Sequence, residues 1–375
     1  MVLRRPDGGD HHRAFEDPRP ACDLAQLGDD AEGNEDERRI GERPITDLRA
    51  YECYHRARQD LYLCSKPGLE TALRRLQRGL DLVGGHPLLH AAIAQAHLVA
   101  LEADLEPRGA GLEAARRAVQ RAQALDARAA QTALAWLERV EGNHLKAIRY
   151  FENALEDDRA NVNALLWLSS SYAYLAGRPA EGRAIAERLI SIDPLTIRNR
   201  FPLGWACAAE GDWAGALAVF EDMDRRDPGI RYGRFHRMFP LARLGRAAEA
   251  CALADETVAE DATDMFAEAA TIFRSALKGD REAVVARVDG ARRDYYWNDP
   301  EFPHWIAGWL ALVGENDRAL TWLGRWVDRG AINHPLLARH DPFLRPLGSE
   351  LRFQRLLDRI EPEWERFVPR FRPDD

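Results

Sequence analysis

The sequence of 375 residues has few of the features that mark a disulfide-stabilised, metal-bound or membrane-inserted protein. Its five cysteines are odd in number and form no C-x-x-C pair, which argues against a disulfide framework or a zinc site and favours reduced thiols. No apolar run approaches membrane-spanning length, and residues 1–20 lack the apolar stretch of a signal peptide. We therefore expect a cytoplasmic protein with no membrane partner.

An excess of positive charge is also missing. The net charge is −9, and residues 1–46 hold seven arginines against twelve acidic residues, so the rest of the chain is nearly neutral. A nucleic-acid scaffold needs a basic stripe, so we do not expect a nucleic-acid partner. Residues 1–43 are polar and show no helical or strand period, which predicts a disordered acidic tail.

Patterns that carry chemistry are scarce. Gly109–Ala114 matches only the loosest dinucleotide fingerprint, and without a preceding strand we interpret it as the start of a helix. Three histidines near acidic residues are interpreted as polar loop residues: His304, His334 and His340. We predict no catalytic residue, no metal and no cofactor, and hence a protein that is not an enzyme.

What the sequence does contain is a repeat. Gly182, Ala216, Ala250 and Val284 lie 34 residues apart and recur at the same place in successive helix–turn–helix patterns. Short turns with glycine separate the two helices of each pair, and such turns favour antiparallel packing. A fixed step of this kind is typical of a solenoid, in which each unit buries its apolar face against its neighbour. We predict an all-α fold, with about eight helix pairs over residues 44–330.

The repeat resembles the tetratricopeptide repeat (TPR). The best unit places Gly204, Ala216, Phe220 and Pro228 where that family has a small residue, Ala, an aromatic residue and Pro, and an earlier unit has Ala147, Phe151 and Ala154. The resemblance implies a right-handed α-solenoid that binds proteins. Pro202 and Pro240 fall inside expected first helices, which must either start late or kink.

Residues 331–375 depart from the repeat. One amphipathic helix is expected there, continuing past Pro362 to residue 367, with an apolar face of Leu351, Phe353, Leu356, Leu357 and Ile360. Because the end of a repeat array exposes an apolar face, we interpret this segment as a loop and a capping helix.

A narrower resemblance covers residues 43–367. Arg43-Pro44-Ile45-Thr46, Ile192-Asp193-Pro194-Leu195 and Asp341-Pro342-Phe343-Leu344 look like the repeat region that accompanies bacterial serine/threonine kinases and related signalling proteins. The chain lacks a Gly-rich loop and the H-R-D and D-F-G motifs. The resemblance therefore implies an interaction module in signalling or regulation, without kinase activity.

The fifth and ninth positions of successive first helices are rich in aromatic residues. In TPR proteins these positions, with the second position, line the concave groove, so we predict that a partner-binding groove is formed by Trp136, Ser170, Arg198, Phe201, Trp205, Phe235, Phe239 and Phe273. Exposed contiguous apolar surface marks a binding site. The alternative is a tight superhelix whose centre these side chains fill.

Few polar residues stand at these positions, so the groove favours an apolar or amphipathic protein segment over a peptide that ends in a carboxylate. The sequence thus predicts a non-catalytic scaffold for protein–protein interaction. The alternative is a regulatory module that acts with a separately encoded kinase or other output enzyme. No oligomeric state is predicted.

Overall fold

A computed structural model describes residues 45–62, 65–228, 231–262 and 264–373, and the predicted disordered tail of residues 1–43 lies outside them. The described residues form helices and contain no strand. They belong to one compact unit, Pro44–Asp375. The all-α prediction is confirmed.

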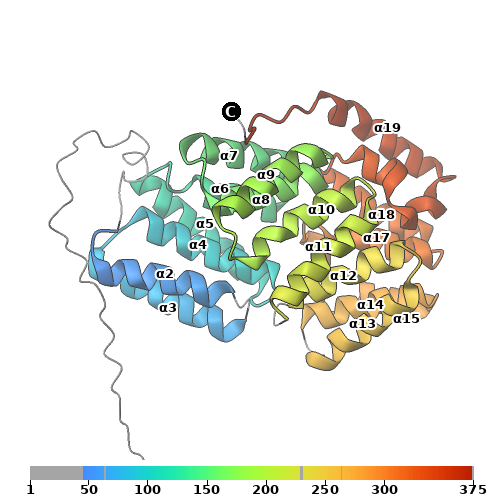
Figure 1. Cartoon of the computed structure of the whole chain (residues 1–375), viewed down its shortest axis with the longest axis horizontal. Coiled ribbons are helices and arrows are strands. Elements are labelled where there is room, and N and C mark those ends of the chain that lie inside the picture. Colours follow the sequence, from blue (N-terminus) through green and yellow to red (C-terminus); the bar gives the residue numbers. More distant parts are fainter. Residues whose placement is uncertain (1–44, 63–64, 229–230, 263, 374–375) are drawn as a thin grey trace, which may run out of the picture. The chain divides into compact units, whose positions relative to one another are not determined.

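Eight antiparallel helix pairs follow one another along the chain (Figure 1). They are α2 (Leu48–Tyr62) with α3 (Lys66–Val83), α4 (Pro87–Glu102) with α5 (Arg108–Leu125), α6 (Gln131–Glu141) with α7 (His144–Asp157), α8 (Val162–Ser170) with α9 (Pro179–Ile192), α10 (Phe201–Ala209) with α11 (Trp213–Arg226), α12 (Arg231–Arg243) with α13 (Ala247–Glu260), α14 (Met265–Leu277) with α15 (Arg281–Val288), and α17 (Phe302–Leu312) with α18 (Asn316–Asp328). Neighbouring pairs pack on each other, as in a solenoid.

The repeat is visible in where the second helices begin. From α7 to α18 they start at residues 144, 179, 213, 247, 281 and 316, in steps of 34 or 35. Two residues before each start lies a glycine with positive φ, from +64° at Gly177 to +93° at Gly142. A side chain with a Cβ would be strained in this left-handed conformation, so glycine sets each turn.

A side-chain cap and two prolines mark positions in the first helices of three pairs. Asp47 accepts hydrogen bonds from the backbone N–H groups of Arg49 and Ala50 at the start of α2. Pro202 stands in the first turn of α10, after a short 3-10 helix η2 (Ile197–Arg200), so this helix starts late. Pro240 lies inside α12.

Close packing within a unit depends on the small residues of the repeat. A Cβ on Gly204 would lie 2.5 Å from the ring of Phe220, so only glycine lets α10 approach α11 this closely. Phe220 is buried, and so are Ala216 and Ala250 at the 34-residue positions. The positions that define the repeat in the sequence are therefore those that hold the helices of a pair together.

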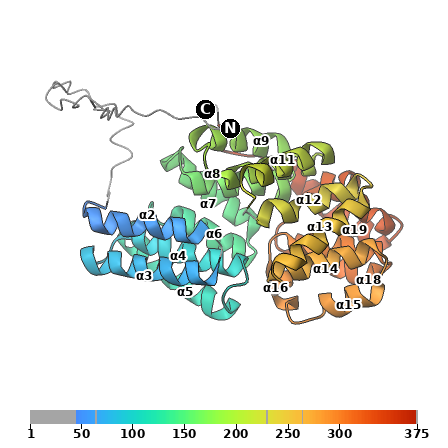
Figure 2. The same cartoon turned by 60° about the horizontal axis from the view of Figure 1, so that its bottom comes forward.

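The pairs do not leave an empty centre. Helix α17 lies against α14 (Figure 1), at the end of the molecule where α14, α15 and α18 gather in Figure 2. Its aromatic side chains contact those of α10, α12 and α14. A short helix, α16 (Arg293–Asn298), precedes α17 and stands outside the helix pairs of the repeat. The π-helix η3 (Leu336–His340) and the 3-10 helix η4 (Pro342–Leu347) follow α18 and also pack inward.

A π-helical turn, η1 (Ser171–Leu175), continues α8 and receives part of this inner segment. The N–H of Ile332 donates to the carbonyl of Leu175, and the amide of Asn333 donates to the carbonyls of Ala173 and Tyr174. These carbonyls at a helix end would otherwise lack partners. The segment after α18 thus completes the hydrogen bonding of the fourth pair.

Helix α19 (Leu351–Arg366) packs on α18 and buries Phe353, Leu357 and Ile360, so the predicted capping helix is present and runs through Pro362. No helix in the described parts of the chain is both long and apolar enough to cross a bilayer.

Candidate functional site

The structure places seven of the eight predicted groove residues in the protein interior. Each of them is at most 5% exposed: Trp136, Ser170, Phe201, Trp205, Phe235, Phe239 and Phe273. Only Arg198 is half-buried, in η2, where its guanidinium lies 5.2 Å from the ring of Trp167. The expected open aromatic groove is therefore corrected to a filled one.

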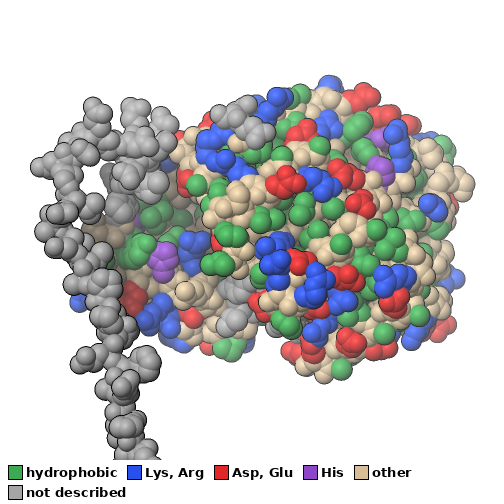
Figure 3. Space-filling model, in the orientation of Figure 1, with side chains coloured by type: hydrophobic (Ala, Val, Ile, Leu, Met, Phe, Trp, Pro, Cys, Tyr) green, Lys and Arg blue, Asp and Glu red, His purple; other side chains and the backbone are tan. Residues whose placement is uncertain are grey.

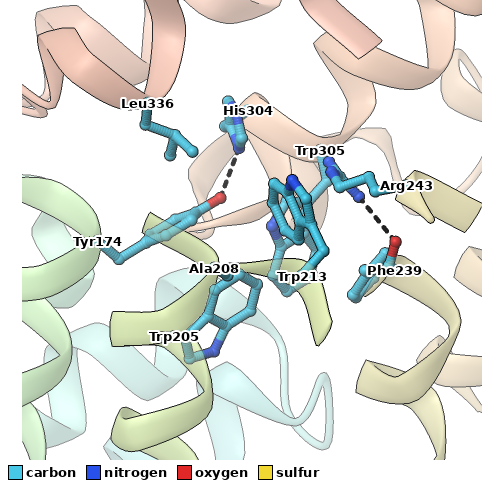
Figure 4. Close-up of a pocket in the computed structure, with 9 residues that line it drawn as sticks. All are labelled: Tyr174, Trp205, Ala208, Trp213, Phe239, Arg243, His304, Trp305 and Leu336. Carbon is cyan, nitrogen blue, oxygen red and sulfur yellow. Dashed lines mark hydrogen bonds between the residues drawn. The ribbon is translucent and has the colours of Figure 1, made fainter. Parts of the chain in front are cut away.

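Helix α17 is what covers the aromatic residues. The ring of Trp305 stacks on Trp205 at 5.5 Å and lies 4.9 Å from Phe239 (Figure 4). The ring of Trp309 lies 5.5 Å from Phe273. Trp305 is 5% exposed and Trp309 is fully buried. The aromatic positions from Phe201 to Phe273 and those of α17 thus form one core, as in the alternative of a filled superhelix, whereas Trp136 packs on Trp167 in a separate cluster.

A chain of buried polar groups crosses this core. The carboxylate of Asp341 accepts two hydrogen bonds from Arg243, at 3.0 and 2.7 Å. His304 Nε2 lies 3.3 Å from Asp341 Oδ2, and His304 Nδ1 lies 2.6 Å from the hydroxyl of Tyr174 (Figure 4). The four side chains come from α12, the segment after η3, α17 and η1, and they tie these elements together.

The pKa values of these groups fix their charges. Burial opposes ionisation of Asp341, but Arg243 and His304 outweigh it and hold the pKa of this carboxyl far below its usual range. Burial lowers the pKa of His304 and raises that of Tyr174. We therefore assign a neutral Tyr174 that donates to His304 Nδ1, which leaves the proton of the ring on Nε2, toward Asp341.

A second buried charge lies between α4, α6 and α17. Arg139 is 2% exposed and donates to Glu102 through Nη1 and to Glu301 through Nη2, while its guanidinium lies 4.3 Å from the Trp167 ring. Burial, opposed by Arg139 and reinforced by Asp299 and Glu102, raises the pKa of Glu301 to about 8. Two neighbouring carboxyls can serve as acid and base in catalysis, but Glu102 and Glu301 both accept hydrogen bonds from Arg139.

These two clusters correct one interpretation of the sequence. His304 and Asp341 are not polar loop residues, since both are buried and lie together. His334 lies 3.9 Å from Glu361, and His340 lies at the end of η3 beside Gly211, so each of the three histidines has different neighbours. Among the described residues, no three His, Cys, Asp or Glu side chains are arranged to hold a metal ion.

The centre of the molecule has almost no free space. The cavity beside Tyr174, Trp205 and Arg243 measures about 10 Å³, which is room for about one water molecule (Figure 4). A larger cleft of about 250 Å³ lies on α11, α12 and α13, and its lining is largely charged: Glu221, Arg237, Arg246, Glu249 and Glu256, with Leu241, Ala252 and Leu253. The cavity beside Tyr174, Trp205 and Arg243 is thus too small for a substrate.

The surface of the repeats carries charges of both signs. On the face shown in Figure 3, Lys and Arg side chains alternate with Asp and Glu side chains over the helices, and hydrophobic side chains lie between them. Mixed charge of this kind is typical of a solvated surface.

Comparisons with known proteins give similarities of fold alone. No family model and no curated protein matches the sequence. Among solved structures, a tetratricopeptide repeat protein of Parabacteroides merdae is 13% identical, with a TM-score of 0.40, over 82% of this chain and 98% of that one. A thermophilic TPR protein of Thermus thermophilus is 19% identical, with a TM-score of 0.32, over 58% and 91%.

The human IFIT1 dimer with PPP-AAAA is 13% identical, with a TM-score of 0.48, over 70% of this chain and 69% of that one. At such values these structures assign neither a ligand nor an activity to this chain. Its own repeat, with second helices every 34 or 35 residues and small residues facing aromatic ones, is that of a TPR-like α-solenoid.

Proposed function

We propose that the protein is a non-catalytic scaffold for protein–protein interaction, acting in signalling or regulation. The observation that carries the proposal is the filled centre of the array, where the cavity holds about one water molecule. Ligand sites for small molecules are usually concave volumes of about 300–1,000 Å³. A solenoid whose centre is filled in this way offers its partners the surfaces of its helices instead.

The partner expected from the sequence is an apolar or amphipathic protein segment. Binding at the predicted groove residues stays a prediction, and it requires α17 to leave the centre of the array. Three polar ties oppose this displacement: Arg139 with Glu301, Tyr174 with His304, and His304 with Asp341. We therefore place the partner on the outer surface of the repeats.

Site-specific photo-crosslinking in native lysate tests the proposal. A photo-reactive residue replaces Tyr51, Leu195 or Glu249, all exposed, and the matched control carries it at buried Trp205. We expect one protein to be captured repeatedly from at least one exposed position and from none at Trp205. Capture from the Trp205 position alone would instead support the predicted open groove as the binding site. Absence of capture together with turnover of a small molecule would overturn the scaffold.

A role beside a separately encoded kinase or other output enzyme is the alternative form of this proposal. It predicts that the captured protein is such an enzyme and that its gene neighbours the gene for this chain.

A further inference from the structure

The chain continues after α19 as an extended segment that lies on α7, η1 and α9. Residues 367–373, here called the strap, follow the end of α19 at Arg366 and contain no helix. In Figure 1 this end of the chain lies beside α7 and α9, far from α18. Six side chains form the surface beneath it, here called the strap groove: Arg149, Glu152, Arg159, Tyr172, Arg178 and Arg188.

Two phenylalanines anchor the strap. Phe367 and Phe371 are 8% and 4% exposed, whereas Val368 between them is 61% exposed. The guanidinium of Arg149 lies 5.1 Å from the ring of Phe367, and that of Arg159 lies 4.8 Å from the ring of Phe371. The groove thus holds two aromatic side chains spaced four residues apart, and cation–π contacts of this kind stabilise each ring.

Further hydrogen bonds from the groove go to backbone carbonyls of the strap. Arg178 donates to the carbonyl of Phe367 at 2.9 Å, and Arg149 donates to that of Val368 at 3.2 Å. Further along, Arg159 and Arg188 donate to the carbonyls of Arg372 and Pro373, at 2.7 and 3.4 Å.

The backbone N–H groups of the strap are bound from below. The N–H of Arg370 donates to the carboxylate of Glu152 at 2.9 Å and to the hydroxyl of Tyr172 at 3.2 Å, and Glu152 is 1% exposed. The N–H of Phe371 reaches the same hydroxyl at 3.4 Å. Contacts to carbonyls and N–H groups do not depend on side-chain identity, so another extended segment with the same two anchors would satisfy them.

Two side chains of the strap carry charge of the same sign as most of the groove side chains. Four of the six groove side chains are arginines and one is a carboxylate, while the strap presents exposed Arg370 and Arg372. A basic surface attracts acidic segments and repels basic ones. An extended segment with acidic residues at these two places would therefore bind more tightly than the strap does.

We propose that the strap groove is a peptide-recognition site, which the strap occupies within its own chain. Its partner is an extended segment of another protein, with two aromatic side chains four residues apart and acidic residues beside the second one. This inference rests on the proposed scaffold function and names the partner class. A tethered segment competes at an effective concentration in the millimolar range, so the partner must exceed the affinity of the strap.

Fluorescence anisotropy with a labelled peptide tests the proposal on the full chain. The probe has the sequence of residues 364–373 with glutamate in place of both Arg370 and Arg372. The protein variant Phe367→Ala/Phe371→Ala empties the two anchor positions of the strap without shortening the chain. We expect this variant to bind the probe about tenfold more tightly than the wild-type chain, because the competing anchors are gone.

Two controls make the result specific. A probe with alanine at both phenylalanine positions should not bind. Adding Arg149→Ala/Arg178→Ala to the variant should abolish binding, whereas Arg225→Ala/Arg226→Ala, on exposed side chains of α11, should leave it unchanged. A folded variant that binds neither probe, or both equally, overturns the proposal.

If the Phe367→Ala/Phe371→Ala variant does not fold, hydrogen exchange of the wild-type chain tests the proposal instead. Excess probe should speed exchange at the amides of Arg370 and Phe371, and unchanged rates would overturn the proposal. If the strap-groove proposal fails, the proposed scaffold function still stands when photo-crosslinking captures a partner elsewhere on the repeats.

Discussion

Replacing Trp205 by alanine separates a filled centre from an open groove. Trp205 is 5% exposed, stacks on Trp305 at 5.5 Å and lies 4.6 Å from the ring of Tyr174. Truncation of a buried aromatic side chain costs about 3–5 kcal/mol. Loss of specific ring pairs adds about 0.5–1.5 kcal/mol for each pair, although neighbouring contacts are not additive. We expect Trp205→Ala to lower the free energy of unfolding by about 3–5 kcal/mol.

Two matched variants set the scale of this measurement. Phe220→Ala removes a ring packed between α10 and α11, and we expect a loss of the same size. Tyr51→Ala removes a ring that is 47% exposed on α2, and we expect a loss of less than about 1 kcal/mol.

Urea unfolding followed by circular dichroism and by tryptophan fluorescence measures all three, and both probes are needed because long repeat arrays can unfold in parts. A loss at Trp205 as small as that at Tyr51 would refute the filled centre and restore the open groove.

Three further predictions concern charge and the C-terminal part of the chain. Asp341→Ala leaves Arg243 buried without its carboxylate and should cost about 3–5 kcal/mol by urea unfolding. Because the folded pKa of Asp341 is lowered, its contribution is complete above the unfolded value of about 3.9 and is lost as the pH falls below it, so Asp341→Asn should flatten the acid limb of a stability–pH curve. The pKa of Glu301 is raised to about 8, so the native state retains a proton that the unfolded state releases; stability should fall as the pH rises from about 4.3 to about 8, and Glu301→Gln should remove this slope. Deletion from Ser349 onward removes α19, which covers α18, and should yield aggregates in size-exclusion chromatography; a soluble monomer would show that the buried Trp322 and Trp326 already close the array.

Local patterns were sufficient to predict the helix pairs. The 34-residue step and the glycine turns depend on neighbours in the sequence, and the second helices from α7 to α18 begin in steps of 34 or 35 residues, as this pattern predicts. One helix was missed: the chain turns after α15, where Arg293 N–H donates to the carbonyl of Gly290, before α16 begins. Gly290 was the available signal for this break.

Closure of the centre could not be predicted in this way. The ties that hold it join residues far apart in sequence: Arg243 and Asp341 are separated by 98 positions, and Tyr174 and His304 by 130. A periodic pattern predicts which positions face the concave side of the array. Whether another element fills that side depends on the curvature of many stacked helix pairs. The same aromatic spacing was therefore compatible with an open groove and with a filled one.

The strap was missed for a related reason. Phe367 and Phe371 are spaced by four residues, which is typical of a helix face, yet the backbone there is extended and both rings are buried against α7, η1 and α9. Their partners Arg149 and Arg159 lie more than 200 positions earlier. No local signal connects these segments.

Native-state hydrogen exchange of α17 tests the filled centre most directly. Its amides, Phe302–Leu312, open only if the helix leaves the aromatic core formed with α10, α12 and α14. Core elements exchange by the global opening of the protein, whereas surface helices exchange by local opening. We predict that α17 exchanges as slowly as α10 and α12 do. Exchange of α17 at the rate of α2, with α10 still protected, would show that the centre stands open in solution.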